Sequence, residues 1–407
     1  MTESHPQAAL AARVAGRWGG EAPGPVFVVV CGIHGNEPAG PAAAERVLSE
    51  LQRRSVRMKG ELIAIRGNLT ALAEKARYVV KDLNRQWTVD RARAVLEADN
   101  PDGLAAEDRE QWEMWQHLGP ALARAEERGR PAVLFDLHTS SANGPPFATM
   151  GDTLRNRTVV FQLPIPVILG LEEVIDGALL EYVNNRGHIT VGIEAGRHDA
   201  PASVDHHEAL LWLGLIAAGC LTELDVPRAA EFRRLLAGAS AGIPRIVEIR
   251  HRHAIRPEDS FSMKPGFTNF DTIHRGEVLG EDREGPVRAP MNGLVLLPLY
   301  QGLGDDGFFM GGEVRRLWLS LSAILRRLSR PFFAELLPGV QRSAHDPESL
   351  VVDTRVARFY PLELFHLFGY RKRRRIGHAL VVSRRRERLN LMGRSRGRAI
   401  AGGPASP

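Results

Sequence analysis

A histidine and a glutamate lie three residues apart where an apolar, strand-like run gives way to a helical pattern. In the segment VFVVVCGIHGNEPAG, His34 and Glu37 follow an apolar run that ends at Gly32. Pro38 suits the first position of the next helix. Both side chains would then lie in the turn at the carboxyl end of a sheet strand, where open α/β sheets bind ligands. Alone, this pair is weak support for a metal site.

A second histidine follows another apolar run. His138 lies in FDLHTSSANG and would reach the same edge of the sheet as His34 and Glu37. Two histidines and one glutamate that leave a fourth position open for water form a catalytic zinc arrangement. Asp136 fits equally well as a partner of a ligating imidazole and as a structural hydrogen-bond acceptor. The pattern therefore predicts a hydrolytic Zn²⁺ site.

A carboxylate near the end of a third apolar strand could complete this chemistry. Glu194 lies in TVGIEAG, and burial of an uncompensated carboxylate is costly. Taken alone, a salt-bridged structural role would be the simpler interpretation. Beside zinc, Glu194 could instead take a proton from the attacking water and pass it to the leaving amine.

The segment ARYVVKDLNRQW supplies donors that suit a substrate carboxylate. Arg77 and Arg85 can each bind a carboxylate through two parallel hydrogen bonds, and Asn84 adds an amide. Asp82 could orient one of these donors or a zinc ligand. In isolation, the segment would be interpreted as a solvated loop.

These residues need a scaffold in which several strand ends meet at one edge. Short apolar runs, mostly bounded by Gly, Pro or Asn, are predicted to be buried parallel strands. Helical patterns separate them, and this alternation favours an α/β domain with a mostly parallel sheet. The strands are expected at 25–32, 61–68, 132–138, 158–165 and 188–196, and the helices at 38–54, 108–129, 170–185 and 205–221.

The pattern changes after about residue 225, where one helix and a small-residue linker follow. Residues 1–240 are predicted to form a zinc hydrolase catalytic domain. Residues 241–320 are predicted to form a smaller β-rich domain, with short strand-like segments at 246–255, 276–280, 285–300 and 307–319. Residues 321–407 form a basic C-terminal extension whose structure the pattern does not define.

Composition narrows the class of protein. Of 407 residues, 44% are hydrophobic and 25% charged, a balance typical of soluble globular proteins. No apolar run is long enough to span a bilayer, and the N-terminus lacks a secretory signal pattern. Two cysteines cannot form a disulfide framework, which favours a reducing compartment. A cytoplasmic location is therefore expected.

Four segments, in their order along the chain, resemble the motifs of the succinylglutamate desuccinylase/aspartoacylase family of the zinc carboxypeptidase superfamily. They are GIHGNEPAG, RYVVKDLNR, DLHTSSANG and VGIEAG, and the resemblance covers roughly residues 25–200. It implies an α/β fold with a zinc-carboxypeptidase-like, mostly parallel mixed sheet flanked by helices. It would make the β-rich region the smaller C-terminal domain of that family.

The resemblance also implies an activity, which is hydrolysis of the amide bond of an N-acyl amino acid or similar small carboxylate with one Zn²⁺ per subunit. It implies metal ligands, catalytic residues and substrate-binding residues. The implied metal ligands are His34, Glu37 and His138. The implied catalytic residues are Glu194, as general base and acid, and Arg77. The implied substrate-binding residues are Asn84 and Arg85, with Arg186 and Tyr300 as the nearest candidates for two further substrate contacts.

Three alternatives remain open. The same ligands would serve a zinc carboxypeptidase acting on a peptide or a cell-wall fragment, although a β-rich domain that narrows access favours small substrates. A zinc-free relative could use the fold only for binding. The basic stretches 371–375 and 384–386, beside the apolar segment 359–368, could contact nucleic acid or an anionic membrane. A solvated basic tail is the simpler interpretation, and self-association into a homo-oligomer is not determined.

Overall fold

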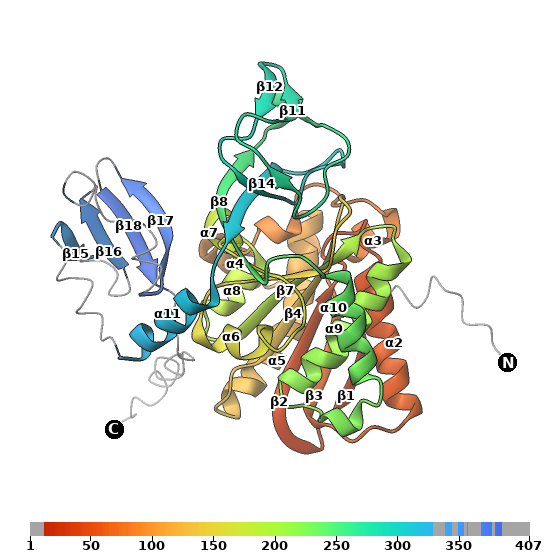
Figure 1. Cartoon of the computed structure of the whole chain (residues 1–407). Coiled ribbons are helices and arrows are strands. Elements are labelled where there is room, and N and C mark those ends of the chain that lie inside the picture. The colour runs from red at the N-terminus through yellow and green to blue at the C-terminus, as the bar shows by residue number, and fades with distance from the viewer. Residues whose placement is uncertain are drawn as a thin grey trace, which may run out of the picture.

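A computed structural model of the chain describes residues 12–328, 338–343, 349–353, 356, 368–376 and 379–384. Its centre is a mixed sheet of eleven strands with helices on both faces (Figure 1). Two smaller antiparallel sheets, of three and four strands, follow in the C-terminal part. The predicted fold class, a mixed α/β sheet flanked by helices with smaller β-sheet regions, is confirmed.

Four neighbouring strands of the central sheet are parallel, in the order β3-β2-β4-β7. Their predicted positions agree with the structure to within three residues at every end. They are almost wholly buried because helices cover both faces, which explains their continuous apolar runs. The strands are β2 (Ala22–Cys31), β3 (Lys59–Arg66), β4 (Val133–Ser140) and β7 (Ile189–Arg197), and β1 (Val14–Gly19) pairs antiparallel with β3 at the edge.

Alternate residues of β2 enter two different cores, as the pleat of a strand requires. Phe27 and Val29 pack in the core on one face, and Val28 and Val30 pack in the core on the other. The helices of the first core are α2 (Ala39–Arg53), α9 (Pro201–Ala217) and α10 (Ala229–Ala239), and those of the second are α4 (Val89–Leu96), α5 (Ala106–Glu127) and α8 (Leu179–Asn184).

The strand predicted at 158–165 is wrong. Helix α6 (Leu154–Val160), whose N-terminus is capped by the Thr153 side chain, ends within this stretch, and residues 161–165 are turns and bends. A short apolar run cannot distinguish a strand from a buried helix by periodicity alone. The strands of this region are instead β5 (Phe147–Met150) and β6 (Val167–Leu169), which lie between β7 and the C-terminal part of the sheet.

The helix predicted over 170–185 is interrupted. Its two parts are α7 (Leu171–Val174) and α8, and Gly177 lies in the break with a φ of 75°. A Cβ atom at this position would lie 2.3 Å from the backbone oxygen of Arg85. Glycine is therefore needed both for the left-handed backbone and for close packing on the segment that carries Arg85.

The central sheet continues past residue 240. Strand β8 pairs parallel with β6, and three antiparallel strands extend the sheet beyond it, while a three-stranded sheet lies past that end (Figure 1). The region is β-rich, and its division into a separate domain stays a prediction. The strands are β8 (Ile246–Ala254), β14 (Asp306–Glu313), β13 (Gly293–Leu296) and β10 (Thr272–Ile273), and in the small sheet β9 (Ser262–Met263), β11 (Val278–Asp282) and β12 (Gly285–Arg288).

Helix α11 (Arg316–Leu328) leads from β14 to the four-stranded sheet. The last part of the strand predicted at 307–319 is thus helical. Among the described residues, no helix has both the length and the apolar content needed to cross a membrane. The predicted apolar segment 359–368 lies outside the described residues except for Phe368. The sheet contains β15 (Val340–Arg342), β16 (Ser349–Asp353), β18 (Ala379–Arg384) and β17 (Tyr370–Ile376) in that order.

Candidate metal and catalytic site

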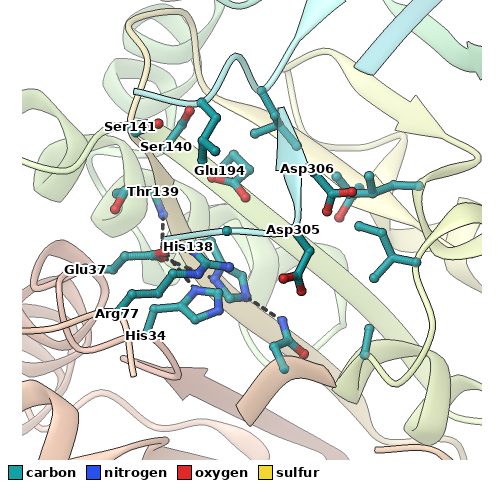
Figure 2. A pocket seen from close by; sticks show the side chains of 18 of the residues that line it. His34, Glu37, Arg77, His138, Thr139, Ser140, Ser141, Glu194, Asp305 and Asp306 are labelled. Carbon is teal, nitrogen blue, oxygen red and sulfur yellow. Dashed lines mark hydrogen bonds and ion pairs between the residues drawn. The ribbon is translucent and has the colours of Figure 1, made fainter. Parts of the chain in front are cut away.

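The three predicted metal ligands come together at the carboxyl edge of the parallel strands (Figure 2). His34 follows β2, Glu37 precedes α2 and His138 lies in β4; all three are buried, and their ligand atoms lie within 4.8 Å of one another. Nδ1 of His34 is 2.8 Å from Oε1 of Glu37, and Nδ1 of His138 is 3.2 Å from Oε2 of Glu37. Two imidazole nitrogens and one carboxylate oxygen so arranged fit the donor set of catalytic zinc.

Gly35 allows the turn that carries His34 to pack against helix α3 (Leu69–Glu74). A Cβ atom at Gly35 would lie 2.0 Å from the carbonyl carbon and oxygen of Ala71. These are backbone atoms, so a larger side chain must displace either the turn or the helix. The position of the candidate metal ligand His34 therefore depends on the glycine that follows it in the chain.

We expect Gly35→Ala to lower the free energy of unfolding by about 1–3 kcal/mol, because the added methyl group overpacks a rigid contact. Urea denaturation would measure the change, and zinc titration would report the displaced His34. Gly103→Ala is the matched control, since a Cβ at Gly103 meets no atom within 4 Å. Equal stability of the two variants would contradict the role given to Gly35.

The ligands shift one another's protonation. Burial by itself would raise the pKa of Glu37, but the His34 and His138 imidazoles lower it well below its usual range. Burial would lower the pKa of His138, but Asp136 and Glu37 raise it well above the ordinary value. Oδ2 of Asp136 lies 2.9 Å from Nε2 of His138. In the absence of a cation, His138 therefore retains a proton that compensates the surrounding carboxylates.

Zinc must displace this proton, because a ligating imidazole is neutral. We expect the apparent zinc affinity to keep rising with pH above about 7.5, where an ordinary histidine has already lost most of its proton. Competition with a chromophoric chelator at several pH values would measure this. In Asp136→Asn the affinity should level off at a lower pH, since the largest charge that raises the pKa of His138 is gone. A pH-independent affinity above about 7.5 in the unaltered protein would exclude the bound proton.

Asp82 connects the metal ligands to Arg77. Its Oδ1 lies 3.2 Å from Nε2 of His34, and its Oδ2 accepts a 2.9 Å hydrogen bond from Nη2 of Arg77. Nη1 of Arg77 lies 3.9 Å from Oε1 of Glu37. Burial disfavours the Arg77 charge, but Asp82 and Glu37 more than offset this, so the Arg77 pKa is raised. The structure thus holds a charged guanidinium beside the candidate metal centre.

Glu194 lies next to His138 on the neighbouring strand, because the two residues are paired in the parallel register of β4 and β7. Its Oε2 atom is buried and has no hydrogen-bond partner among the described residues. Burial raises the pKa of Glu194 to about 8; the nearby charges act in both directions, His138 lowering it and Glu37 raising it. A carboxyl group whose pKa lies near neutrality can both accept and return a proton.

One pocket of about 150 Å³ is lined by His34, Glu37, Arg77, His138 and Glu194. A larger groove of about 760 Å³ between α2, α9 and α10 contains none of them. The β-rich region closes part of the pocket, so residues far apart in the chain share it. The wall from that region includes Leu297, Leu299, Gln301, Asp305, Asp306 and Phe309.

Residues 23–207 match the family model of the succinylglutamate desuccinylase/aspartoacylase catalytic domain. These residues belong to the succinylglutamate desuccinylase/aspartoacylase family. The resemblance of the four sequence segments is thereby confirmed. The matched stretch begins in β2 and ends in α9, so it contains His34, Glu37, Arg77, His138 and Glu194.

Individual relatives are distant. Succinylglutamate desuccinylase of Shewanella sp. (strain MR-4) is 23% identical over 120 residues, which are 30% of this chain and 33% of that protein. Succinylglutamate desuccinylase of Shewanella putrefaciens is 25% identical over 114 residues, which are 28% of this chain and 31% of that protein. The chain therefore spans about a third of the length of these curated relatives.

Solved structures share the fold at low identity. The succinylglutamate desuccinylase/aspartoacylase of Rhodobacter sphaeroides is 18% identical with a TM-score of 0.51, covering 72% of this chain and 87% of that chain. The product-bound ectoine utilization protein EutE (DoeB) of Ruegeria pomeroyi is 19% identical with a TM-score of 0.51, covering 73% and 87%. Because 72% of the 407 residues is more than 207 residues, the shared architecture extends beyond residue 207, where the match to the family model ends.

In this desuccinylase/aspartoacylase domain, Asn84 and Arg85 line the pocket but already have protein partners. Oδ1 of Asn84 accepts a 2.9 Å hydrogen bond from the backbone N–H of Leu179. Nη2 of Arg85 donates to Asp306 over 3.3 Å, and Asp306 also accepts a 2.5 Å hydrogen bond from Arg252. A substrate carboxylate would therefore share Arg85 with Asp306. Sequence reasoning missed Asp306 because it lies 221 residues from Arg85 in the chain.

The side chains of Arg186 and Tyr300 are held by other protein groups, and their contact with a substrate stays a prediction. The Arg186 guanidinium lies 3.6 Å from the ring centroid of Tyr182 and donates to its hydroxyl, so it is held against α8. The Tyr300 hydroxyl accepts a hydrogen bond from the backbone N–H of Phe267 and donates to the backbone oxygen of Lys264, each over 2.9 Å. Neither side chain is among those that line the pocket.

His198 is a pocket residue to which sequence reasoning gave no role. Its Nδ1 lies 2.7 Å from Oγ1 of Thr139, and its Nε2 lies 3.2 Å from Oε1 of Gln301. Gln301 also accepts a 2.9 Å hydrogen bond from Asn36. Its position just after β7, four residues beyond Glu194, is the signal that could have identified His198.

Proposed function

We propose that the chain is a zinc-dependent amidohydrolase that cleaves the amide bond of an N-acyl amino acid or a similar small carboxylate. One observation supports this most strongly. A ligand set suited to zinc, a carboxyl group whose buried Oε2 has no hydrogen-bond partner among the described residues, and a charged arginine line one pocket. The family match, and the name desuccinylase carried by the relatives, agree with amide hydrolysis.

His34, Glu37 and His138 would hold the metal. Bound there, zinc would supply Lewis acidity and lower the pKa of water from about 16 toward 7. Glu194 accepts the proton of the attacking water at its buried carboxylate and returns it to the nitrogen of the leaving amine. Because β4 and β7 are hydrogen-bonded neighbours, the position of Glu194 relative to His138 is set by the sheet.

Arg77 stabilises the negative charge that develops on the carbonyl oxygen. Its place beside Glu37 is fixed by the hydrogen bond to Asp82, so little reorganisation is needed during the reaction. A preorganised donor of this kind contributes about 2.7–4 kcal/mol to transition-state stabilisation. Arg85 then orients the substrate through its carboxylate, which brings the scissile carbonyl toward the water.

The pocket supports a small substrate over a long peptide. Its free volume is about 150 Å³, and residues 297–309 of the β-rich region form one wall. A zinc carboxypeptidase acting on peptides or cell-wall fragments remains the second candidate, because the same ligands and the same arginines would serve it.

A substrate panel would test the proposal. Zinc-loaded protein is assayed against N-acetyl and N-succinyl amino acids and against short peptides, with zinc content measured in parallel and the chelated protein as control. We expect release of a free amino acid from at least one N-acyl substrate, dependent on zinc. Peptide cleavage without N-acyl hydrolysis would favour the carboxypeptidase. Purified protein that takes up no zinc would exclude both.

A further inference from the structure

One side of helix α11 packs against the body of the protein through buried polar contacts and through Leu319. Arg326 pairs with Asp152 over 2.8 Å, and both side chains are fully buried. Arg157 donates to the backbone oxygen of Leu319 over 2.9 Å and to Oγ of Ser322 over 3.5 Å. These buried polar contacts, together with Leu319, which packs in the main hydrophobic core, fix the helix in place.

The opposite side of α11 presents large apolar side chains to solvent. Leu317 is 77% exposed, Trp318 53%, Leu321 38% and Ile324 53%. Positions 317, 321 and 324 follow the spacing of one helical face, with Trp318 beside them. We call these four residues the α11 apolar face. Elsewhere in the described part of the chain, exposed large hydrophobic residues occur singly or in pairs. Contiguous exposed apolar residues mark a surface that binds something.

Charge is distributed very unevenly between this region and the rest of the chain. Residues 315–407 contain 20 Lys and Arg but only 6 Asp and Glu, a net charge of +14. The whole chain carries +5, so residues 1–314 carry −9. Arg315 and Arg327 are exposed near the two ends of α11, and β17 contains five basic residues in succession at 371–375.

We propose that the α11 apolar face and the basic C-terminal region bind the surface of an anionic lipid membrane. A helix with Trp and Leu on one face and arginines beside it inserts that face at the boundary of headgroups and acyl chains. Anionic lipids attract the nearby Lys and Arg residues. Residues 1–314, with their net charge of −9, are repelled by the same surface, so the protein approaches the lipid through the α11 apolar face and the arginines beside it.

Two other occupants fit the surface less well. Nucleic acid would pair with the arginines but would leave Leu317, Trp318 and Ile324 exposed, because phosphate contacts do not need aliphatic side chains. A second copy of the chain would cover the apolar face but would bring two regions of +14 charge together, which like-charge repulsion opposes. An anionic bilayer satisfies both the apolar and the charged component.

Cosedimentation of the full chain with vesicles tests the proposal. We expect binding to vesicles of equal parts phosphatidylcholine and phosphatidylglycerol, weakened by salt, and little binding to phosphatidylcholine alone. The variant Leu317→Gln, Trp318→Gln, Ile324→Gln should lower the affinity for anionic vesicles at least about tenfold. Leu224→Gln is the matched control, because Leu224 is 93% exposed and lies between α9 and α10. Thermal unfolding should be unchanged in both variants, since all substituted side chains are exposed.

Fluorescence gives an independent readout of the same contact. Anionic vesicles should shift the tryptophan emission to shorter wavelength, and Trp318→Phe should remove this shift while retaining binding. The proposal would be overturned by a lack of binding to anionic vesicles, or by equal binding of the triple variant and the unaltered protein. It would also be overturned if the full chain bound duplex DNA, if this DNA prevented vesicle binding, and if the triple variant bound DNA equally well. A dimer that dissociates in the triple variant, without any vesicle binding, would assign the face to a second copy instead.

Discussion

Replacement of Glu194 by glutamine should leave zinc bound and lower kcat by about 10²–10⁴-fold, the usual contribution of a general acid–base group. Glutamine has nearly the same shape as glutamate but cannot take a proton from water. The carboxylate is not among the three clustered donor residues, so its removal should spare the metal. The measurements are kcat on the best N-acyl substrate and zinc content of the purified variant.

The pH profile gives the same residue a second test. Burial raises the pKa of Glu194 to about 8 in the absence of metal, and a bound dication lowers it because it stabilises the carboxylate. Activity should therefore fall as pH drops below the pKa of the metal-loaded form, since a protonated carboxyl group cannot accept another proton. Glu194→Gln should lose this acidic limb. The exposed Glu284→Gln variant serves as control, and full turnover by Glu194→Gln would refute the assignment.

Removing one ligand should have the largest effect of all. His138→Ala is expected to lose stoichiometric zinc after dialysis and to have no detectable hydrolysis, because only two of the three donors remain. Zinc should raise the midpoint of thermal unfolding of the unaltered protein, since a ligand that binds only the folded state stabilises it. The same addition should not shift the midpoint of His138→Ala.

His198→Ala is the matched control for this experiment. His198 lines the same pocket but does not belong to the donor cluster, so the variant should retain zinc and its thermal response. If His138→Ala kept one zinc per chain, or if His198→Ala lost it, the ligand set would have to be redrawn.

Sequence patterns were sufficient to locate the chemistry, because the elements that carry it are simple. His34 and Glu37 follow one buried strand, and His138 and Glu194 lie in two others. Parallel pairing of β2 with β4 and of β4 with β7 brings these positions to one edge. Long apolar runs define such strands well, so the fold class and the family followed from the residues alone.

The parts that were missed depend on tertiary contacts or on short elements. Gln301 and Asp306 reach the pocket from the far end of the sheet, and no local pattern marks them. Arg186 was a candidate by proximity in sequence, and in the structure it stacks on Tyr182, so its contact with a substrate stays a prediction. The apolar run at 158–165 carries no periodicity long enough to separate a strand from helix α6.

The continuity of the sheet through β6, β8 and β14 has a consequence for how selectivity can evolve. The strands that carry the candidate catalytic residues and the strands of the β-rich region that line the pocket belong to one hydrogen-bonded sheet. Asp306, from the β-rich region, accepts a hydrogen bond from Arg85. The pocket is therefore formed before the substrate binds, and substrate binding requires little conformational change. Substitutions in the segment 297–305, which connects β13 to β14, can then change the substrate specificity without moving the candidate catalytic residues.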